Sequence, residues 1–382
     1  MNYQLKAPAR INLLGNPTDA NEGDFATISA AVNIYAHAVI EPILDSQKIV
    51  LEQVDMDRNH SIHTIHEEHS TAAIPLPLFG KFKLVKAAIN RLFYFSAEFQ
   101  EKVRKNGFFL KTWTDVPRQS GLGGSSLFVI LTLGGLRALY ELDPFQHNNY
   151  TFAEITQRVE AKDLNITAGY ADRYVPFFGG IAYIDYRGKL HQKSLQEEPY
   201  ATYERLDPWG ESLPIVAISS GIEHDSGDVH LKMRPKYLKE YDDWLSQGGE
   251  SPPMVRFMQT AWETAWRGKI ALLNRDWQTF GDLMNTNHAV VDQMMRYCGF
   301  KDGAGWVNNL LIQTALDHGA YGAKLTGAGR GGSVFAITHP ENKNDLKETW
   351  ERKAAESGLR KSTIYIPRIA RNGLCVSPLK KQ

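Results

Sequence analysis

The feature that constrains this chain most is a glycine- and serine-rich segment that passes directly into a long apolar run. Residues 117–130 read PRQSGLGGSSLFVI, and the apolar run continues from Leu127 as LFVILTLGGLRAL. Serine favours a helix start, and the run is long enough for a buried helix but too short to span a bilayer. We therefore expect a loop of bare backbone that leads into the N-terminus of a buried helix.

Such a loop is suited to an anion. Backbone N–H groups surround an anion closely only where side chains do not intervene, and a helix N-terminus adds unpaired donors and a favourable dipole. A plain tight turn ahead of a buried helix is the alternative interpretation. A P-loop is excluded, because it needs Gly-Lys followed by Ser or Thr, and the chain contains no such tripeptide.

A second glycine cluster lies near the C-terminus, in the stretch GAKLTGAGRGGSVFAI at 322–337. Its glycines Gly327, Gly329 and Gly332 have the G-x-G-x-x-G spacing of dinucleotide-binding folds. That fold requires a strand before the glycines and a helix after them, whereas here a helix-like segment precedes and a strand-like segment follows. The pattern disfavours a dinucleotide-dependent enzyme.

Composition narrows the class of partner and compartment. The 43 basic residues balance the 43 acidic ones, so no overall field favours nucleic acid or a membrane surface, and we expect a small-molecule partner. Only Cys298 and Cys375 are present, too few for a disulfide framework and consistent with a reducing compartment. The N-terminal residues lack the pattern of a secretory signal, so a cytoplasmic location is expected.

The length of 382 residues favours two domains, and the local patterns predict α+β structure in both. Strand-like alternation occupies 26–43 and 107–117, and helical periodicity occupies 82–95 and 152–165. Arg187 and Gly188 are predicted to form a hairpin turn between two strand-like runs.

A turn-rich stretch at 206–214 predicts a boundary between domains at 1–205 and 206–382. Helices are expected over 252–275 and 305–319, and strands over 333–338 and 362–370.

Four histidines recur at three-residue intervals at positions 60, 63, 66 and 69. Imidazole is a common metal ligand, but this spacing drifts around a helix and does not alternate onto one strand face. We therefore predict a polar connection and no metal site.

Three motifs together are specific. PARINLLGNPTD, PRQSGLGGSS and GAKLTGAGRGGS resemble, in order, the motifs of the galactokinase, homoserine kinase, mevalonate kinase and phosphomevalonate kinase (GHMP) superfamily, and they span nearly the whole chain. The closest resemblance is to the glucuronokinases, through LLGNPTD, AGYADRYVPFFGGIAYIDY and DSGDVHLKMRPKYL. The resemblance implies a ribosomal-protein-like α/β domain followed by a ferredoxin-like α+β domain.

The resemblance implies that the glycine loop wraps the phosphates of ATP and that Mg²⁺ accompanies the nucleotide. Ser126 at the helix start would ligate the metal, and Glu160 would supply its carboxylate, the alternative being that Glu160 is a solvated helix residue. The expected ATP-binding residues are Pro117, Gly121, Leu122, Gly123, Gly124, Ser125 and Ser126.

Asp172 matches the catalytic aspartate of the superfamily, which would accept or orient the proton of the attacking hydroxyl. A helix or turn cap is the alternative role. Arg10 takes the position at which relatives carry Arg or Lys, and it would hold the aspartate and neutralise charge on the phosphoryl group.

The acceptor side is expected to contain Asp19, which matches the aspartate that grips sugar hydroxyls. Asn16 and Pro17 replace the Glu and His of the galactokinase-like pattern, a departure that argues against galactose. A uronate carboxylate suits a guanidinium, so Arg118 and Arg173 are candidates, unless they serve the nucleotide or an internal ion pair.

Two further parts of the chain are expected to contribute to substrate binding. The first is the pair Gly327 and Gly329. The second is the helix 283–294, in which Asn287 and His288 are possible contacts. A helix that simply packs its apolar face is compatible with the same pattern.

The resulting interpretation is an ATP- and Mg²⁺-dependent sugar kinase that converts glucuronate to glucuronate 1-phosphate by direct in-line transfer. The alternatives are a kinase of the same superfamily for galacturonate, galactose or a heptose phosphate, and a non-catalytic sugar sensor on the same fold.

Overall fold

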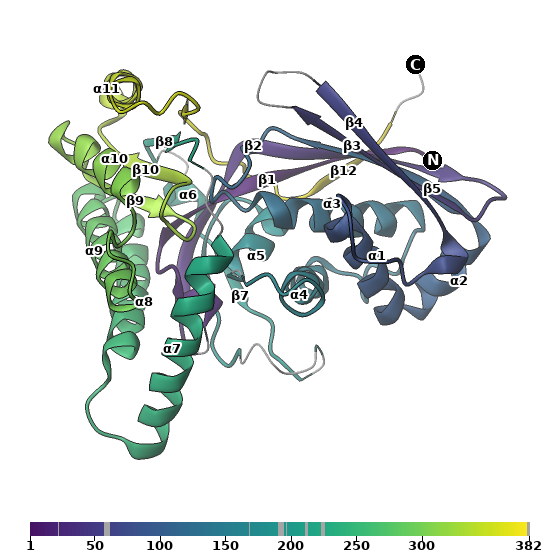
Figure 1. The fold of residues 1–382 in the computed structure, drawn as a ribbon, viewed down its shortest axis with the longest axis horizontal. Coiled ribbons are helices and arrows are strands. Elements are labelled where there is room, and N and C mark those ends of the chain that lie inside the picture. The colour runs from purple at the N-terminus through teal and green to yellow at the C-terminus, as the bar shows by residue number, and fades with distance from the viewer. Residues whose placement is uncertain are drawn as a thin grey trace.

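The computed structural model describes residues 1–21, 23–56, 62–167, 169–189, 195, 197–210, 213–222 and 226–379. These residues form two lobes, each built on its own β-sheet (Figure 1). The first lobe has a large mixed sheet with helices below it in this view, and the second has a small antiparallel sheet flanked by helices.

The first sheet is organised around one long strand, β2, whose two halves have different neighbours. The strands of this sheet are β1 (Tyr3–Leu14), β2 (Ala26–Ile43), β3 (Lys48–Met56), β4 (Ile62–Ser70), β5 (Gly107–Thr114), β6 (Ile181–Asp185), β7 (Thr202–Arg205) and β12 (Cys375–Pro378). Their order is β12-β1-β2-β5-β3-β4, and β6 pairs with β2 and β7. Only the β3–β5 pair is parallel. Because β6 pairs with 26–30 and β5 with 36–43, β2 links both parts of the sheet.

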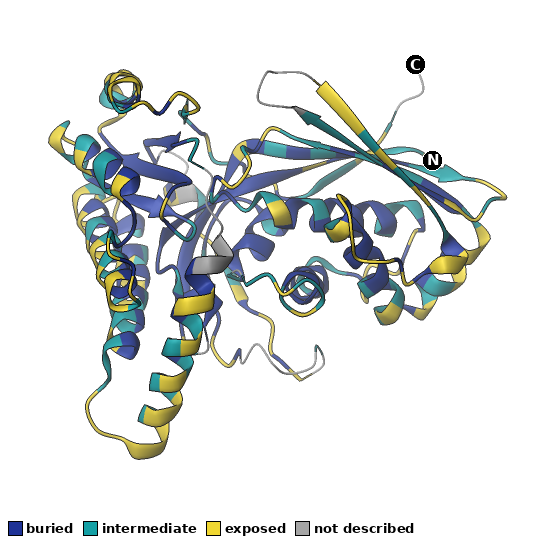
Figure 2. Ribbon diagram, in the orientation of Figure 1, coloured by how far each residue is buried: buried dark blue, intermediate teal, exposed yellow. Residues whose placement is uncertain are grey.

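The helices of the first lobe pack on this sheet or beside it. They are α1 (Lys83–Phe95), α2 (Ala97–Lys105), α3 (Gly124–Leu139), α4 (Asn149–Arg158) and α5 (Ala171–Phe178), with the short helices α6 (Asp207–Gly210), η1 (Thr18–Ala20) and η2 (Thr71–Ala73) and the π-helical segment η3 (Val159–Asp163). The central helix α3 packs on β1, β2 and α1, and it is dark blue along most of its length in Figure 2. Its continuous apolar sequence is explained by contact on several sides.

Side-chain caps start two of these helices. Ser96 accepts a hydrogen bond from Phe99 N at the start of α2, and Asn148 accepts one from Thr151 N at the start of α4. These caps satisfy backbone donors that the helices themselves leave unpaired.

The second lobe is built on the sheet β11-β8-β10-β9, whose neighbouring pairs are all antiparallel. Its elements are β8 (Ile215–Ser219), β9 (Gly322–Thr326), β10 (Ser333–Ile337), β11 (Thr363–Tyr365), α7 (Ser226–Gln247), α8 (Pro253–Leu273), α9 (Trp277–Tyr297), α10 (Trp306–Asp317), η4 (Pro340–Asn342) and α11 (Lys343–Glu356). Trp350 is fully buried and donates from Nε1 to Leu311 O at 2.9 Å, which fastens α11 to α10. The end of α7 and the start of α8 form an arm that projects away from both sheets (Figure 1), whereas a later part of α8 packs on β1 and β2.

Most of the predicted elements are confirmed. The apolar run after the glycine loop is α3, the alternating stretch is β2, and the periodic stretch at 252–275 is α8. The hairpin predicted at Arg187 and Gly188 cannot be followed to its second run, because 190–194 lie outside the described residues; β6 pairs instead with β7.

The prediction for the histidine-rich stretch is wrong. Residues 62–70 are strand β4, paired with β3 along its whole length, and not a polar connection. His66 Nε2 lies 3.0 Å from Glu68 Oε1, and His69 Nε2 lies 3.1 Å from Glu67 Oε2. These two histidines therefore contact carboxylates of the same strand. His60 lies outside the described residues.

The end of the chain returns to the first lobe. Strand β12 pairs with β1, and Ala370 N donates to Ala31 O at 2.9 Å. The boundary predicted between residues 205 and 206 stays a prediction, but the topology shows that the C-terminal strand completes the first sheet.

The path of the segment before β12 depends on a glycine in α3. A Cβ atom on Gly134 would lie 2.4 Å from Leu374 Cδ2, which is closer than carbon atoms approach. The glycine therefore makes room for the segment that precedes β12.

We expect Gly134→Ala to destabilise the protein, although alanine is the better helix former by about 1 kcal/mol. In a Leu374→Ala background the collision disappears, and the same substitution should then stabilise the protein by up to about 1 kcal/mol. Urea unfolding of the four proteins of this double-mutant cycle measures both effects. Additive effects would contradict the contact.

Candidate active site

The glycine loop ends at the N-terminus of α3, as the sequence predicts. Gly123 is the N-cap residue with φ 80°, and Gly121 has φ 72°, so both adopt a backbone conformation that favours glycine. The side chain of Leu122 between them is buried, and its carbonyl accepts a hydrogen bond from Arg10 N at 3.2 Å. The loop is therefore anchored to β1.

The two glycine-rich segments lie back to back, although about two hundred residues separate them. A Cβ on Gly121 would lie 2.5 Å from Thr326 O, and a Cβ on Gly327 would lie 2.8 Å from Gly121 Cα. A Cβ on Gly332 would come within 3.1 Å of Ser120 O. The second glycine cluster thus allows the backbone of the second lobe to approach the loop closely.

Arg10 joins the loop to Asp172. Arg10 Nε donates to Asp172 Oδ1 at 2.6 Å, Nη2 lies 2.5 Å from the same oxygen, and Nη1 donates to Gly121 O. Asp172 lies in the first turn of α5, and both side chains are buried. The two residues predicted to act together are therefore in direct contact.

Glu160 lies beside the first turn of α3 and is fully buried. Ser125 Oγ donates to Glu160 Oε1 at 2.9 Å, and Ser126 Oγ donates to Oε2 at 2.7 Å. Arg173 Nη2 lies 2.6 Å from Glu160 Oε2. The alternative that Glu160 is a solvated helix residue is wrong. Its π-helical segment, a geometry that is common near functional sites, brings its carboxylate to the loop.

This donor set fits magnesium. Carboxylate and hydroxyl oxygens are the ligands that Mg²⁺ prefers, and the ion usually shares its remaining positions between water and the phosphates of a substrate. Arg173 Nη2 pairs with Glu160 Oε2 and so holds this carboxylate in place. The structure brings the two predicted ligands, Ser126 and Glu160, together, and their role in metal binding stays a prediction.

Asp19 lies in η1, between β1 and β2, and faces the start of α5. Its Oδ2 accepts a hydrogen bond from Ala171 N at 3.0 Å, and its carbonyl accepts one from Tyr170 N at 3.1 Å. Burial, together with the negative charge of Asp172, raises the pKa of Asp19 to about 6. The two aspartates therefore influence each other at one site.

Asn16 lies on the turn before η1, where two residues of the second lobe hold it. Asn287 accepts from Gly15 N and donates to Asn16 O, both at 3.0 Å. Lys324 Nζ donates to Asn16 Oδ1 at 2.7 Å. Asn287 thus fixes the backbone of this turn. His288, the other candidate on α9, is bonded to Asn309 Oδ1 at 3.0 Å, and burial lowers its pKa to about 4.

The two arginines proposed to bind a carboxylate both have protein partners. Arg118 is exposed and pairs with Asp55 on β3. Arg173 is fully buried and donates to Gly169 O. Its contact with Glu160 is the internal ion pair that the sequence analysis gave as an alternative.

The other predicted residues are placed as follows. Pro117 begins the loop and is partly buried, and Pro17 is buried less than its neighbours in the turn. A Cβ on Gly329 would lie 3.0 Å from Ala304 O, so this glycine faces the second lobe, whereas Gly327 faces the loop.

Sequence reasoning assigned no role to two residues that the structure places at this site. Lys324 donates to Asn16, and Thr326 Oγ1 accepts from Asn12 N at 3.1 Å. Both belong to β9, where every residue is buried. The available signal was a lysine inside a short strand between apolar neighbours, because lysine is rarely buried without a reason.

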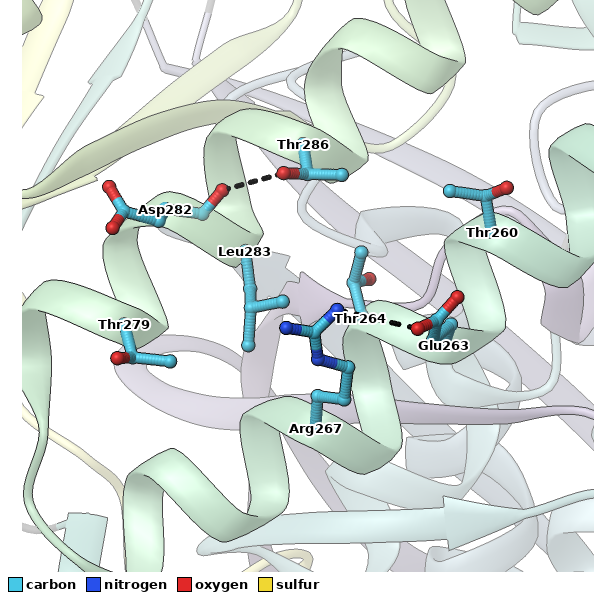
Figure 3. Close-up of a pocket in the computed structure, with 8 residues that line it drawn as sticks. All are labelled: Thr260, Glu263, Thr264, Arg267, Thr279, Asp282, Leu283 and Thr286. Atoms are coloured by element: carbon cyan, nitrogen blue, oxygen red, sulfur yellow. Dashed lines mark hydrogen bonds and ion pairs between the residues drawn. The ribbon is translucent and has the colours of Figure 1, made fainter.

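A separate groove of about 310 Å³ lies between α8 and α9 (Figure 3). Threonines and charged residues such as Glu263, Arg267 and Asp282 line it. The singly named site residues of the sequence analysis do not line it, whereas Leu283 and Thr286 of the predicted helix 283–294 do. Within the described ranges, no three or more His, Cys, Asp or Glu side chains are grouped so as to hold a metal ion. Among the same residues, no helix combines the length and apolar character needed to cross a bilayer.

Comparisons with known proteins agree with the geometry. Residues 83–180 match the family model of the GHMP kinases N terminal domain, and residues 269–356 match that of the GHMP kinases C terminal domain. Glucuronokinase 1 of Arabidopsis thaliana is 28% identical over 351 residues, which cover 89% of this chain and 86% of that protein. A D-glycero-alpha-D-manno-heptose 7-phosphate kinase of Campylobacter jejuni is 24% identical over 353 residues, which cover 90% and 91%.

A solved structure shows the same fold. Lactococcus lactis galactokinase, complexed with galactose, superposes with a TM-score of 0.73 over 99% of this chain and 95% of that chain, at 18% sequence identity. The predicted two-domain fold of mixed helices and sheets is confirmed.

The raised pKa of Asp19 predicts a pH-dependent stability. Between about pH 6 and the unfolded value of 3.8, the folded protein binds this proton more tightly, so stability from this group increases as the pH falls through that window. Asp19→Asn removes the dependence and keeps an acceptor for Ala171 N. The free energy of unfolding of the variant, relative to that of wild type, should be higher at pH 7.5 than at pH 4 by about 2 kcal/mol.

Urea unfolding at the two pH values measures this difference. An equal effect of Asp19→Asn at both would contradict the raised pKa.

Proposed function

The chain belongs to the GHMP kinase family, and on that premise we propose that it is an ATP-dependent sugar kinase that converts glucuronate to glucuronate 1-phosphate. The observation that carries the proposal is the contact between Arg10, Asp172 and the glycine loop. This contact joins a carboxylate that can receive a proton to a loop that can hold phosphates.

The reaction proceeds by in-line transfer. Asp172 accepts the proton of the anomeric hydroxyl as the hydroxyl oxygen forms its bond to the γ-phosphorus, and the bond from that phosphorus to the bridging oxygen of ADP breaks. Arg10 keeps the carboxylate of Asp172 oriented and places a positive charge beside the loop. Positioning and charge neutralisation supply most of the rate in such transfers.

The loop and the start of α3 hold the nucleotide. Backbone amides around Gly123 face the β- and γ-phosphates, and the dipole of α3 favours their charge. Ser126 and Glu160 would hold Mg²⁺, which when bound neutralises charge on the phosphates. Arg173 positions Glu160 for this task.

Two sugars are candidates for the acceptor. The similarity to Arabidopsis glucuronokinase 1 favours glucuronate, and a heptose 7-phosphate is the second candidate, because the Campylobacter jejuni kinase matches over the same extent. The buried ion pair between Arg10 and Asp172 favours an enzyme over a sugar sensor, because sensing needs no group that accepts a proton.

An ADP-release assay with glucuronate, galacturonate, glucose, galactose and heptose phosphates tests the substrate. We expect the largest kcat/KM with glucuronate. A larger value with a heptose phosphate would replace glucuronate by the second candidate, and release with none of these acceptors would contradict a sugar kinase.

Asp172→Asn should lower kcat by about 10²- to 10⁴-fold, because the amide cannot accept the proton. The affinity for ATP, measured by calorimetry, should change little. Asp207→Asn is a matched control, since Asp207 also pairs with an arginine, Arg205, but lies outside the proposed site. Loss of ATP affinity in Asp172→Asn would indicate damage to the loop instead.

Ser126→Ala and Glu160→Gln should each raise the Mg²⁺ concentration that gives half-maximal rate, by about 10-fold or more, because each removes an oxygen ligand. A titration of Mg²⁺ at saturating ATP measures the shift. Unchanged metal dependence in both variants would show that the metal is held elsewhere.

A further inference from the structure

Lys324 is a buried cation at the junction of the two lobes. It lies in the middle of β9, has no exposed surface, and faces the turn that carries Asn16. Its Nζ donates to three oxygens, which are Asn16 Oδ1 at 2.7 Å, Leu325 O at 3.0 Å and Asn12 O at 3.2 Å. All three acceptors are neutral amide oxygens.

The charges around Lys324 do not compensate it directly. In the part of the chain that the structure describes, no carboxylate oxygen lies within 4.0 Å of its Nζ. Asp19 acts on it favourably from a greater distance and Arg10 acts unfavourably, while burial is the largest influence and lowers its pKa to about 7. A buried cation without a counter-ion is costly, so this position is suited to an anion that arrives with a ligand.

The lysine also decides how the Asn16 amide is oriented. An ammonium group has only donors, so the atom of Asn16 that receives its hydrogen bond is the oxygen. The NH₂ group therefore points away from Lys324, and no described residue accepts a hydrogen bond from it. Asn287 holds the backbone of the same residue, and the hydrogen bond from Lys324 Nζ to Oδ1 fixes the orientation of its side-chain amide.

We propose that Lys324 is a specificity-determining residue that holds the Asn16 amide with its NH₂ group toward the acceptor sugar, where this donor and the charge behind it select a carboxylate. The proposal rests on the sugar-kinase function proposed above and names the residues that distinguish an acidic from a neutral sugar. Lys324 acts through Asn16 and is a positioning residue. It takes the role that the sequence assigned to Arg118 or Arg173, both of which have carboxylate partners of their own.

Asn16→Asp tests this directly. The aspartate keeps an oxygen for Lys324, and so retains the contact that holds the turn, but it replaces the NH₂ group by a negatively charged oxygen. We expect the ratio of kcat/KM for glucuronate to kcat/KM for glucose to fall by about 100-fold or more, chiefly through KM for glucuronate. The affinity for ADP should stay within about threefold of wild type, because the nucleotide is held by the loop at the start of α3.

Lys324→Met is the second variant, since methionine has a similar length but cannot hold the amide. Its ratio should fall by about 10-fold, because Asn16 can then rotate. If Lys324→Met does not fold, Asn16→Asp alone decides. Asn285→Asp is the matched control: Asn285 Oδ1 accepts from Ala323 N on the same strand, and the variant makes the same chemical change outside the site.

The outcomes separate the two proposals. A wild-type enzyme that prefers a neutral sugar overturns the glucuronate assignment, and with it the selection of a carboxylate. A wild-type enzyme that prefers glucuronate, with a ratio unchanged within about threefold in Asn16→Asp, overturns only the role of Lys324 and Asn16. An equal fall in Asn285→Asp would also overturn it, because the effect would then be a general effect of added charge.

Discussion

The site depends on the close approach of two backbones at Gly121 and Gly327. Neither residue leaves room for a Cβ, and their contact brings the end of β9 against the loop at the N-terminus of α3. Thr326 and Lys324 then reach Asn12 and Asn16 on the other lobe. Side chains at the glycines would hold the two lobes apart and would separate the acceptor side from the phosphate side.

Around this contact the buried charges balance. Three cations and three carboxylates lie buried within hydrogen-bonding networks that touch the loop, η1 or β9. They are Arg10, Arg173 and Lys324, and Asp19, Asp172 and Glu160. Arg10 pairs directly with Asp172, and Arg173 pairs directly with Glu160. Lys324 and Asp19 are not in direct contact, and burial raises the pKa of Asp19 and lowers that of Lys324. The charges without a direct partner thus lie on the side of the site where we propose that the acceptor sugar binds.

A second buried network supports the helix that carries Asp172. Arg158 bridges Glu154 at 2.9 Å and Glu198 at 2.8 Å, and Lys189 lies 2.7 Å from Glu154. Tyr170 donates to Glu198 at 3.3 Å and immediately precedes α5. Because each of these charges is paired, removal of one partner would leave another unpaired in the interior, which makes the start of α5 a rigid support for Asp172, the carboxylate proposed to be catalytic.

The sequence by itself determined the local features of this protein: the glycine loop, the buried helix after it, and the residues Arg10, Glu160 and Asp172 as one predicted constellation. These features follow from rules that act within a few residues, such as the backbone freedom of glycine and helix capping. They also follow from three motifs that occur in the same order as in the GHMP superfamily. Only the tertiary structure decided which partner each charge chooses. Arg173 pairs with Glu160, Arg118 pairs with Asp55, and Lys324 meets Asn16 across 308 positions. The strand of the histidine-rich stretch and the return of β12 to β1 were decided in the same way. The physical reason is that a buried charge or a strand edge is paired with whichever group the packing of distant segments brings next to it. The local sequence around the charge or the strand does not identify that distant partner.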